Sequence, residues 1–260
     1  MTPFEPTREQ VLAFCAQSPV ERVFLEDVAR RGLGRFFALA APTGGRLTAL
    51  CHAGANLVPS GSGCAGFGEV AARAGSRMII GESVAVSELW GSTQSMFPQP
   101  REDRTHQPVY VLREPPPPGD SGLRPATSRD LGRLLPACAA AHELELGVDP
   151  MSRDADGFRW RTSAQIDEGR SWVWLEDGVI RFKAEASAWT PQAVQLQQVW
   201  VDPQARGLGY GARGLRDLCR LLLERTPNVT LFVRTENAPA IALYEAIGMQ
   251  KALEYRSILF

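Results

Sequence analysis

The chain has 260 residues, of which 44% are hydrophobic and 22% charged, and its formal net charge at pH 7 is -1. The apolar fraction excludes wholesale disorder, and the balanced charge gives no basic field that would attract nucleic acid or an anionic membrane. The five cysteines are scattered without a CxxC spacing, so they suggest neither a disulfide framework nor a zinc site. Because the first residues lack a signal-peptide pattern and no apolar run is long enough to span a membrane, we expect a cytoplasmic protein.

The first part of the chain alternates short apolar runs with glycine-rich turns, which predicts a mixture of strands and helices. The predicted elements, in chain order, are strands over residues 36–41, 47–52 and 56–59, a helix over 69–74, a strand over 78–80, a helix over 86–92 and a strand over 109–112. A turn at residues 43–45 would join the first two strands. A glycine-rich segment at residues 61–68 would connect the third strand to the first helix.

Four consecutive prolines at residues 115–118, followed by Gly-Asp-Ser-Gly, form the clearest linker in the sequence. Consecutive prolines favour the extended polyproline II conformation, and glycine and serine loosen the chain that follows. We therefore place a domain boundary here, between an N-terminal domain over residues 1–116 and a second domain over residues 117–260.

The second part of the chain has stronger periodicity. The predicted elements are helices over residues 128–146 and 157–167, strands over 171–176, 179–188 and 194–201, a glycine-rich loop, a helix with an apolar face, a strand over 229–233, a helix over 238–247 and a strand over 253–260. The order of elements in the first part loosely repeats this one. The first part is therefore interpreted as a degenerate copy of the same fold.

The apolar strand that ends at Val201 is followed by a glycine-rich loop and then by a helix. Glycines expose consecutive backbone N–H groups, and the start of a helix adds unpaired donors and the positive end of its dipole. Arg206 supplies a permanent cation beside these donors. This order predicts an anion site that suits a pyrophosphate.

Two other interpretations of this loop stay open. Gly207, Gly209 and Ala212 have the Gly-x-Gly-x-x-Ala spacing of dinucleotide-binding proteins. In that fold the first glycine closely follows the strand, whereas here residues 202–206 intervene. The loop could also be a tight strand-to-helix turn without a ligand.

Residues 204–209, Gln-Ala-Arg-Gly-Leu-Gly, fit the Gln/Arg-x-x-Gly-x-Gly/Ala signature of the GNAT acetyltransferases. Residues 237–249 resemble a second motif of that family, Asn-x-x-Ala-x-x-Leu-Tyr-x-x-x-Gly-Phe, with Met249 in place of the last aromatic residue. Residues 24–27 and 51–59 look similar to the N-terminal domain of actinobacterial two-domain GNAT proteins, a domain that is uncharacterised. The resemblance implies an α/β protein with a mixed α+β sheet: the GNAT acyl-CoA N-acyltransferase fold, in tandem with a degenerate N-terminal GNAT-like domain.

The resemblance also implies a co-substrate, acetyl-CoA, and the residues that would bind it. The pyrophosphate would be held by the loop residues Gln204, Ala205, Arg206, Gly207, Leu208, Gly209 and Tyr210. The pantetheine arm would be contacted by Val199, Trp200, Val201, Asn237, Ala240 and Tyr244. In the family the strand before the loop splays from its neighbour and offers free backbone groups to this arm.

The same resemblance assigns Tyr244 as the acid that protonates the departing thiolate. A base must also remove a proton from the acceptor, because an ammonium ion cannot attack a thioester. The strand before the loop reads Gln-Leu-Gln-Gln at residues 195–198, so the glutamate common in the family is absent there. The remaining candidates for the base are Glu185, Glu145 and Glu143, each of which could instead be a solvated surface carboxylate. No metal is implied.

The function we expect is direct transfer of an acetyl group from acetyl-CoA to an amine of a small molecule or a peptide. A non-catalytic acyl-CoA-binding module is one alternative, and a dinucleotide-dependent oxidoreductase is another. We expect no nucleic-acid partner and no membrane contact, and a homodimer stays open.

Overall fold

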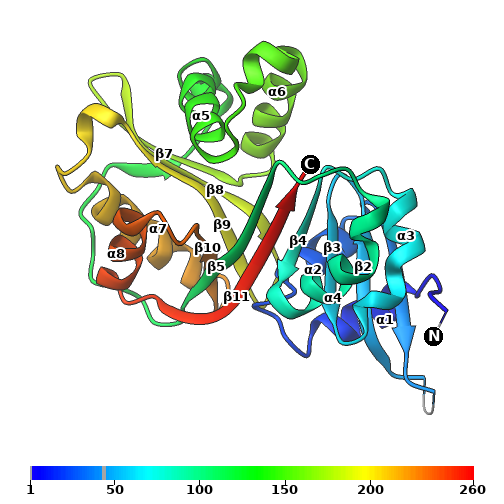
Figure 1. Cartoon of the computed structure of the whole chain (residues 1–260). Helices are drawn as coiled ribbons and strands as arrows, with labels where there is room; N and C mark the ends of the chain where they lie inside the picture. The colour runs from blue at the N-terminus through cyan, green and yellow to red at the C-terminus, as the bar shows by residue number, and fades with distance from the viewer. Residues whose placement is uncertain (1, 43–44) are drawn as a thin grey trace.

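The computed structural model describes residues 2–42 and 45–260, so part of the turn predicted at residues 43–45 lies outside the described residues. Over the described chain, one continuous sheet holds eleven strands in the order β1-β2-β3-β4-β11-β5-β10-β9-β8-β7-β6 (Figure 1). The sheet is mixed, with helices against it, as the sequence predicts. Among these residues, no helix combines the length and apolarity needed to cross a membrane.

The elements of the first half match most of the predicted ones. They are α1 (Arg8–Cys15), α2 (Val23–Arg30), β1 (Arg35–Ala40), β2 (Leu47–Ala53), β3 (Leu57–Gly61), the 3-10 turn η1 (Cys64–Phe67), α3 (Gly68–Arg73), β4 (Met78–Glu82), α4 (Ser83–Thr93), η2 (Gln94–Met96) and β5 (Glu102–Leu112). The sequence analysis missed α1 and α2. It also predicted β5 too short, because the first half of this strand is polar and its identity as a strand comes from pairing with β11.

The elements of the second half follow the predicted order. They are β6 (Leu123–Pro125), η3 (Ser128–Asp130), α5 (Leu131–Leu146), α6 (Pro150–Asp167), β7 (Ser171–Glu176), β8 (Val179–Trp189), β9 (Val194–Val201), η4 (Pro203–Ala205), α7 (Tyr210–Leu223), β10 (Val229–Phe232), α8 (Ala238–Ala246) and β11 (Gln250–Leu259). The short strand β6 was not predicted. Helix α6 begins earlier than predicted, and its backbone is non-helical at Asp154.

The two halves exchange strands in the middle of the sheet. The last strand of the chain, β11, lies between β4 and β5, and β5 in turn lies between β11 and β10 (Figure 1). All of these neighbours are antiparallel. A cut at the proline segment would therefore leave each fragment without a strand that its own half packs against.

Strands β9 and β10 diverge. Within the described residues they run parallel and pair at two positions, Val194 with Val229 and Gln195 with Thr230. From Leu196 to Val201 the edge of β9 that faces β10 has no strand partner, although its other edge pairs with β8. This divergence is the splay that the resemblance implies.

Different helices cover the two faces of the second half. Trp172 and Trp174 of β7 pack with the apolar face of α7, whereas Val173, between them, packs with α5 and α6. This alternation follows from the two-residue period of side chains along a strand. Helices α5 and α6 thus lie on one face of the sheet of the second half, on the side opposite to α7 (Figure 1).

The proline segment is fixed against α7 instead of hanging free. Asp217 accepts hydrogen bonds from the backbone N–H groups of Gly119 and Ser121, at 2.7 and 2.8 Å, and Arg220 donates to the carbonyl of Pro116 at 2.9 Å. A Cβ on Gly119 would overlap the carbonyl oxygen of Arg213. Only glycine therefore allows the chain to approach α7 this closely.

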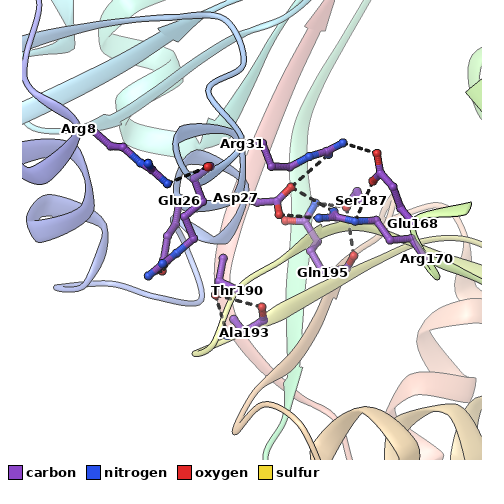
Figure 2. Close-up of polar contacts among 11 residues, drawn as sticks. Arg8, Glu26, Asp27, Arg31, Glu168, Arg170, Ser187, Thr190, Ala193 and Gln195 are labelled. Carbon is purple, nitrogen blue, oxygen red and sulfur yellow. Dashed lines mark hydrogen bonds and ion pairs between the residues drawn. The ribbon is translucent and has the colours of Figure 1, made fainter. Parts of the chain in front are cut away.

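A buried ion-pair network joins the first half to the second. Figure 2 shows Asp27 of α2 facing Arg170, which lies just before β7, and the two pair at 2.7 Å. Arg31 contacts Asp27 at 3.6 Å and Glu168 at 2.5 Å, and Glu168 also contacts Arg170. Asp27 and Arg170 are 2% and 9% exposed, so the pair is shielded from water. This contact holds α2 against β8 and fixes one wall of the cavity described below.

Candidate active site

The loop that links β9 to α7 has the geometry of an anion cradle. Gly207 and Gly209 have φ angles of 76° and 86°, in the left-handed region, and a Cβ on Gly207 would meet no atom within 4 Å. No side chain caps α7, and within the described chain no carbonyl or side chain accepts from the N–H groups of Tyr210, Gly211 and Ala212. These donors, the helix dipole and the open space together suit a pyrophosphate.

The other predicted loop residues lie around this cradle. Gln204, Arg206 and Leu208 are exposed, whereas Ala205 is buried beneath the turn. The backbone N–H of Gln204 donates to the carboxylate of Asp202, which fixes the turn before the glycines. The hydroxyl of Tyr210 contacts Glu176. Arg206 therefore has its charge in solvent beside the free N–H groups.

The unpaired part of β9 continues from this loop into the sheet. Val199 and Val201 pack toward α7 and α8, whereas Trp200 packs on the opposite face, against the cluster of α5 and α6. The Trp200 side chain therefore lies on the side of the sheet where the cavity opens. The half-exposed side chains and the free edge of β9 suit a ligand that adds like a strand.

Helix α8 begins and ends as its motif predicts. The Asn237 side chain accepts from the backbone N–H of Ala240 at 3.3 Å, so it caps the helix. Tyr244 is 6% exposed and lies 6.1 Å from Tyr110, centroid to centroid. Burial, and then the nearby Glu145, raise the pKa of the Tyr244 hydroxyl above its usual range. The phenol therefore keeps its proton at neutral pH.

Glu145, at the end of α5, lines the cavity and is near enough to Tyr244 to affect the pKa of its hydroxyl. Burial raises the pKa of Glu145, and the guanidinium groups of Arg104 and Arg234 oppose that shift. Arg104 itself is held by Glu102 at 2.7 Å and donates to the backbone carbonyl of Glu145 at 2.8 Å. A carboxylate with a raised pKa is a better proton acceptor than an ordinary one.

Glu185 is in a different environment, a buried polar cluster on β8, β9 and α5. The ammonium group of Lys183, 0% exposed, lies 2.5 Å from Glu185, 3.1 Å from the Cys138 sulfur and 3.2 Å from the Gln198 side-chain oxygen. Burial, the largest effect, lowers the pKa of Lys183, but Glu185 and Cys138 together outweigh it, so this pKa is raised. Burial raises the pKa of the Cys138 thiol to about 12, so the thiol stays protonated. A role as base would require Glu185 to leave its ion pair.

A cavity of about 1090 Å³ lies between the two halves and contains both carboxylates. The second half lines it with Cys138, His142, Glu145, Glu185, Gln197 and Gln198. The first half lines it with Glu21, Asn56, Ser60, Arg77, Glu82 and Arg104. Glu143 is exposed on α5 and is not among the lining residues. Among the described residues, no group of three or more His, Cys, Asp and Glu side chains is placed to hold a metal ion.

The site contains residues that the sequence analysis missed. Lys183 pairs with the predicted Glu185 from two residues earlier on the same strand, a spacing that already places both side chains on one face. No sequence pattern marks the lining residues of the first half. Ser60, Arg77 and Arg104 are ordinary polar residues that lie far apart in the sequence. Only the pairing of β11 with β4 and β5 brings them to the site.

The first half has a similar loop, but its donors are occupied. Gly61 and Gly63, after β3, have φ angles of 91° and 85°. The backbone N–H groups of Gly63 and Cys64 both donate to one carboxylate oxygen of Glu88, each at 2.8 Å. Glu88 lies on α4, so the protein itself supplies the anion here.

Two family models match the chain. Residues 34–134 match a domain of unknown function (DUF4081), and residues 138–249 match the acetyltransferase (GNAT) family. A mycothiol acetyltransferase from Nocardioides sp. (strain ATCC BAA-499 / JS614) is 33% identical over 108 residues, which cover 38% of this chain and 35% of that protein. The chain spans about a third or less of the length of the curated relatives it matches.

Solved structures resemble the whole chain. A GCN5-related N-acetyltransferase from Sphaerobacter thermophilus matches with a TM-score of 0.62 and 17% identity, over 98% of this chain and 94% of that one. A tandem GNAT protein from the clavulanic acid biosynthesis pathway matches with a TM-score of 0.55 and 14% identity, over 98% and 97% of the two chains. At these identities the likeness concerns the fold alone, and it confirms the predicted tandem GNAT architecture.

Proposed function

The chain belongs to the GNAT acetyltransferase family, and we propose that it transfers an acetyl group from acetyl-CoA to an amine held in the cavity between its halves. The observation that carries this proposal is the continuous path from the glycine loop along the free edge of β9 to the cavity. The loop would bind the pyrophosphate, and Val199, Trp200 and Val201 would bind the pantetheine arm through their backbone. Asn237 and Ala240, at the start of α8, would border the same arm.

Glu145 and Tyr244 would divide the proton transfers. Glu145 would remove a proton from the acceptor's ammonium group, which frees the nitrogen lone pair to form the new amide bond. As the carbon–sulfur bond breaks, the Tyr244 hydroxyl would give its proton to the departing sulfur. The acid must hold a proton until it is needed, and the base must accept one. Burial suits both roles, because it keeps the Tyr244 phenol protonated and makes the Glu145 carboxylate more basic.

Glu185 would serve as a binding group for the acceptor and not as the base. One of its oxygens accepts from Lys183, whereas the other has a single long contact, 3.4 Å from the Gln197 amide. That second oxygen could therefore accept a hydrogen bond from a donor group of the acceptor within the cavity. Lys183 would keep the carboxylate in place.

The acceptor itself is not identified by the relatives. The match to proteins named mycothiol acetyltransferase covers about a third of this chain, so it supports acetyl transfer more than any particular acceptor. The cavity volume fits a small molecule or the end of a peptide.

The test is release of free CoA thiol from acetyl-CoA in the presence of a panel of amines. We expect turnover with at least one amine, rising with pH as Glu145 loses its proton. Glu145→Gln should remove this acidic limb of the pH profile, whereas Glu185→Gln should mainly raise KM. An unchanged pH profile in Glu145→Gln would rule out Glu145 as the base.

A non-catalytic acyl-CoA-binding module is the second candidate, and the missing glutamate on β9 favours it. CoA binding by calorimetry without thiol release for any amine would establish that function instead. The dinucleotide-binding alternative loses its structural basis, because β9 is antiparallel to β8 and the parallel βαβ arrangement is limited to the short pairing with β10.

A further inference from the structure

Three exposed arginines line the cavity. Arg77 precedes β4, Arg101 precedes β5 and Arg153 lies in the first turn of α6. The end of β11 ties the first two together, because the N–H of Phe260 donates to the carbonyl of Arg77 and the N–H of Arg101 donates to the carbonyl of Leu259. Three separate segments therefore present cations to one space.

Arg101 lies near Glu102 and Arg77 near Asp154, but neither arginine forms an ion pair with that carboxylate. Among the residues that the structure describes, none of the three has a carboxylate oxygen within 4.0 Å. The side chain of Arg101 donates to the carbonyl of Leu146 at 3.1 Å, which fixes its direction without cancelling its charge. Nearby acids are already committed, since Asp154 pairs with Arg161 and Glu102 with Arg104.

Arg101 lies close to Glu145. Leu146, which accepts from Arg101, follows Glu145 directly, and the carbonyl of Glu145 accepts from Arg104. An acceptor whose amine lies at Glu145 could therefore place a second group near the guanidinium of Arg101.

We propose that the acceptor carries an anionic group, a carboxylate or a phosphate, besides its amine, and that Arg77, Arg101 and Arg153 bind that group. The inference rests on the proposed function, because it takes Glu145 as the place where the amine reacts. Guanidinium groups suit both anions, since they donate in a planar fork that matches carboxylate and phosphate oxygens. The two halves would thus share recognition of the acceptor, with Arg77 from the first and Arg153 from the second.

The test uses matched pairs of amines and the protein saturated with CoA. Calorimetry would compare a dipeptide with its C-terminal amide, and an aminoalkyl phosphate with the corresponding amino alcohol. We expect the anionic member of at least one pair to bind about tenfold more tightly or better, and the preferred pair distinguishes carboxylate from phosphate. The triple variant Arg77→Gln, Arg101→Gln, Arg153→Gln should lose this preference. Arg159→Gln, on an exposed position of α6 that does not line the cavity, should keep it.

The outcomes separate this inference from the proposed function. Equal binding of the charged and neutral members, no binding of any anionic amine, or a preference that survives in the triple variant would overturn the inference. Thiol release that favours neutral amines would also overturn it while leaving acetyl transfer intact. The protein could also bind the anionic member more tightly, lose that preference in the triple variant, and release no thiol with any amine. That result would support binding of an anionic ligand by the three arginines and would contradict the proposed acetyl transfer.

Discussion

The two glycine loops have nearly the same backbone and opposite chemistry. Gly209 and Gly63 have φ angles of 86° and 85°, and each precedes a helical turn. In the second half the N–H groups that follow Gly209 are open, whereas in the first half Glu88 accepts from the N–H groups of Gly63 and Cys64. One carboxylate on α4 therefore separates a loop that can take a pyrophosphate from a loop that has already satisfied its donors.

The strands before these loops also differ in how many backbone groups they leave unpaired. β9 continues to Val201 beyond its pairing with β10, whereas β3 ends at Gly61, soon after its single pair, Leu57 with Ile79. β3 also contains Pro59, which has no N–H to donate. The unpaired end of β3 is therefore shorter than that of β9 and offers one donor fewer. The first half also supplies one wall of the cavity.

The largest expected effect concerns the contact that joins the halves. Asp27→Ala would leave Arg170 buried beside Glu168 alone, and we expect the free energy of unfolding to fall by about 3–5 kcal/mol. Chemical denaturation measures this loss. Arg35→Ala, which removes an exposed pair with Glu5, should cost less than about 1 kcal/mol. A similar small loss for Asp27→Ala would mean that the halves are not coupled through this network.

The comparison of the loops is tested directly by two matched substitutions. Gly209→Asp should weaken CoA binding at least about 100-fold, because its carboxylate would repel the pyrophosphate. Gly63→Asp places the same side chain at the same φ angle in the other loop and should leave CoA affinity unchanged. Calorimetry on the folded variants measures both. If Gly63→Asp weakened CoA binding as much, the assignment of the donor site to the second half would be wrong.

A third substitution tests the role of Tyr244. Tyr244→Phe keeps the ring but removes the proton for the departing sulfur, so we expect kcat to fall about 100-fold with little change in CoA affinity. Tyr110→Phe is the control: its ring packs against Tyr244 and its hydroxyl donates to Glu245. Equal kcat values for the two variants would make Tyr244 a packing residue.

The smallest expected effect concerns Glu88, which occupies the N–H groups of the glycine loop in the first half. Glu88→Ala would expose the N–H groups of Gly63 and Cys64 and should lower the free energy of unfolding by about 1–2 kcal/mol. Because the unpaired end of β3 is short and contains Pro59, we expect calorimetry to find one CoA per chain, as in the unchanged protein. A stoichiometry of two would show that Glu88 alone had closed a second donor site.

Local patterns were sufficient where neighbours in the sequence decide the structure. The glycine loop, the Asn237 cap and the apolar face of α7 each depend on residues within a few positions, so they were predicted with their chemistry. Helix α1 was missed because its apolar residues show little periodicity, whereas α2 is amphipathic but only eight residues long. The first half of β5 is charged and becomes a strand only by pairing with β11.

The sequence by itself determined the fold family, because two short motifs resemble those of the GNAT family, and it predicted the donor loop and the candidate acid Tyr244. Only the tertiary structure showed how differently the two candidate carboxylates are placed and which residues of the first half line the cavity. Glu145 and Glu185 look alike in the sequence, but burial beside Tyr244 raises the pKa of one, and Lys183 pairs with the other. The cavity arises where β11 crosses into the first half, a long-range pairing that brings Arg77 and Arg101 beside α5 and α6.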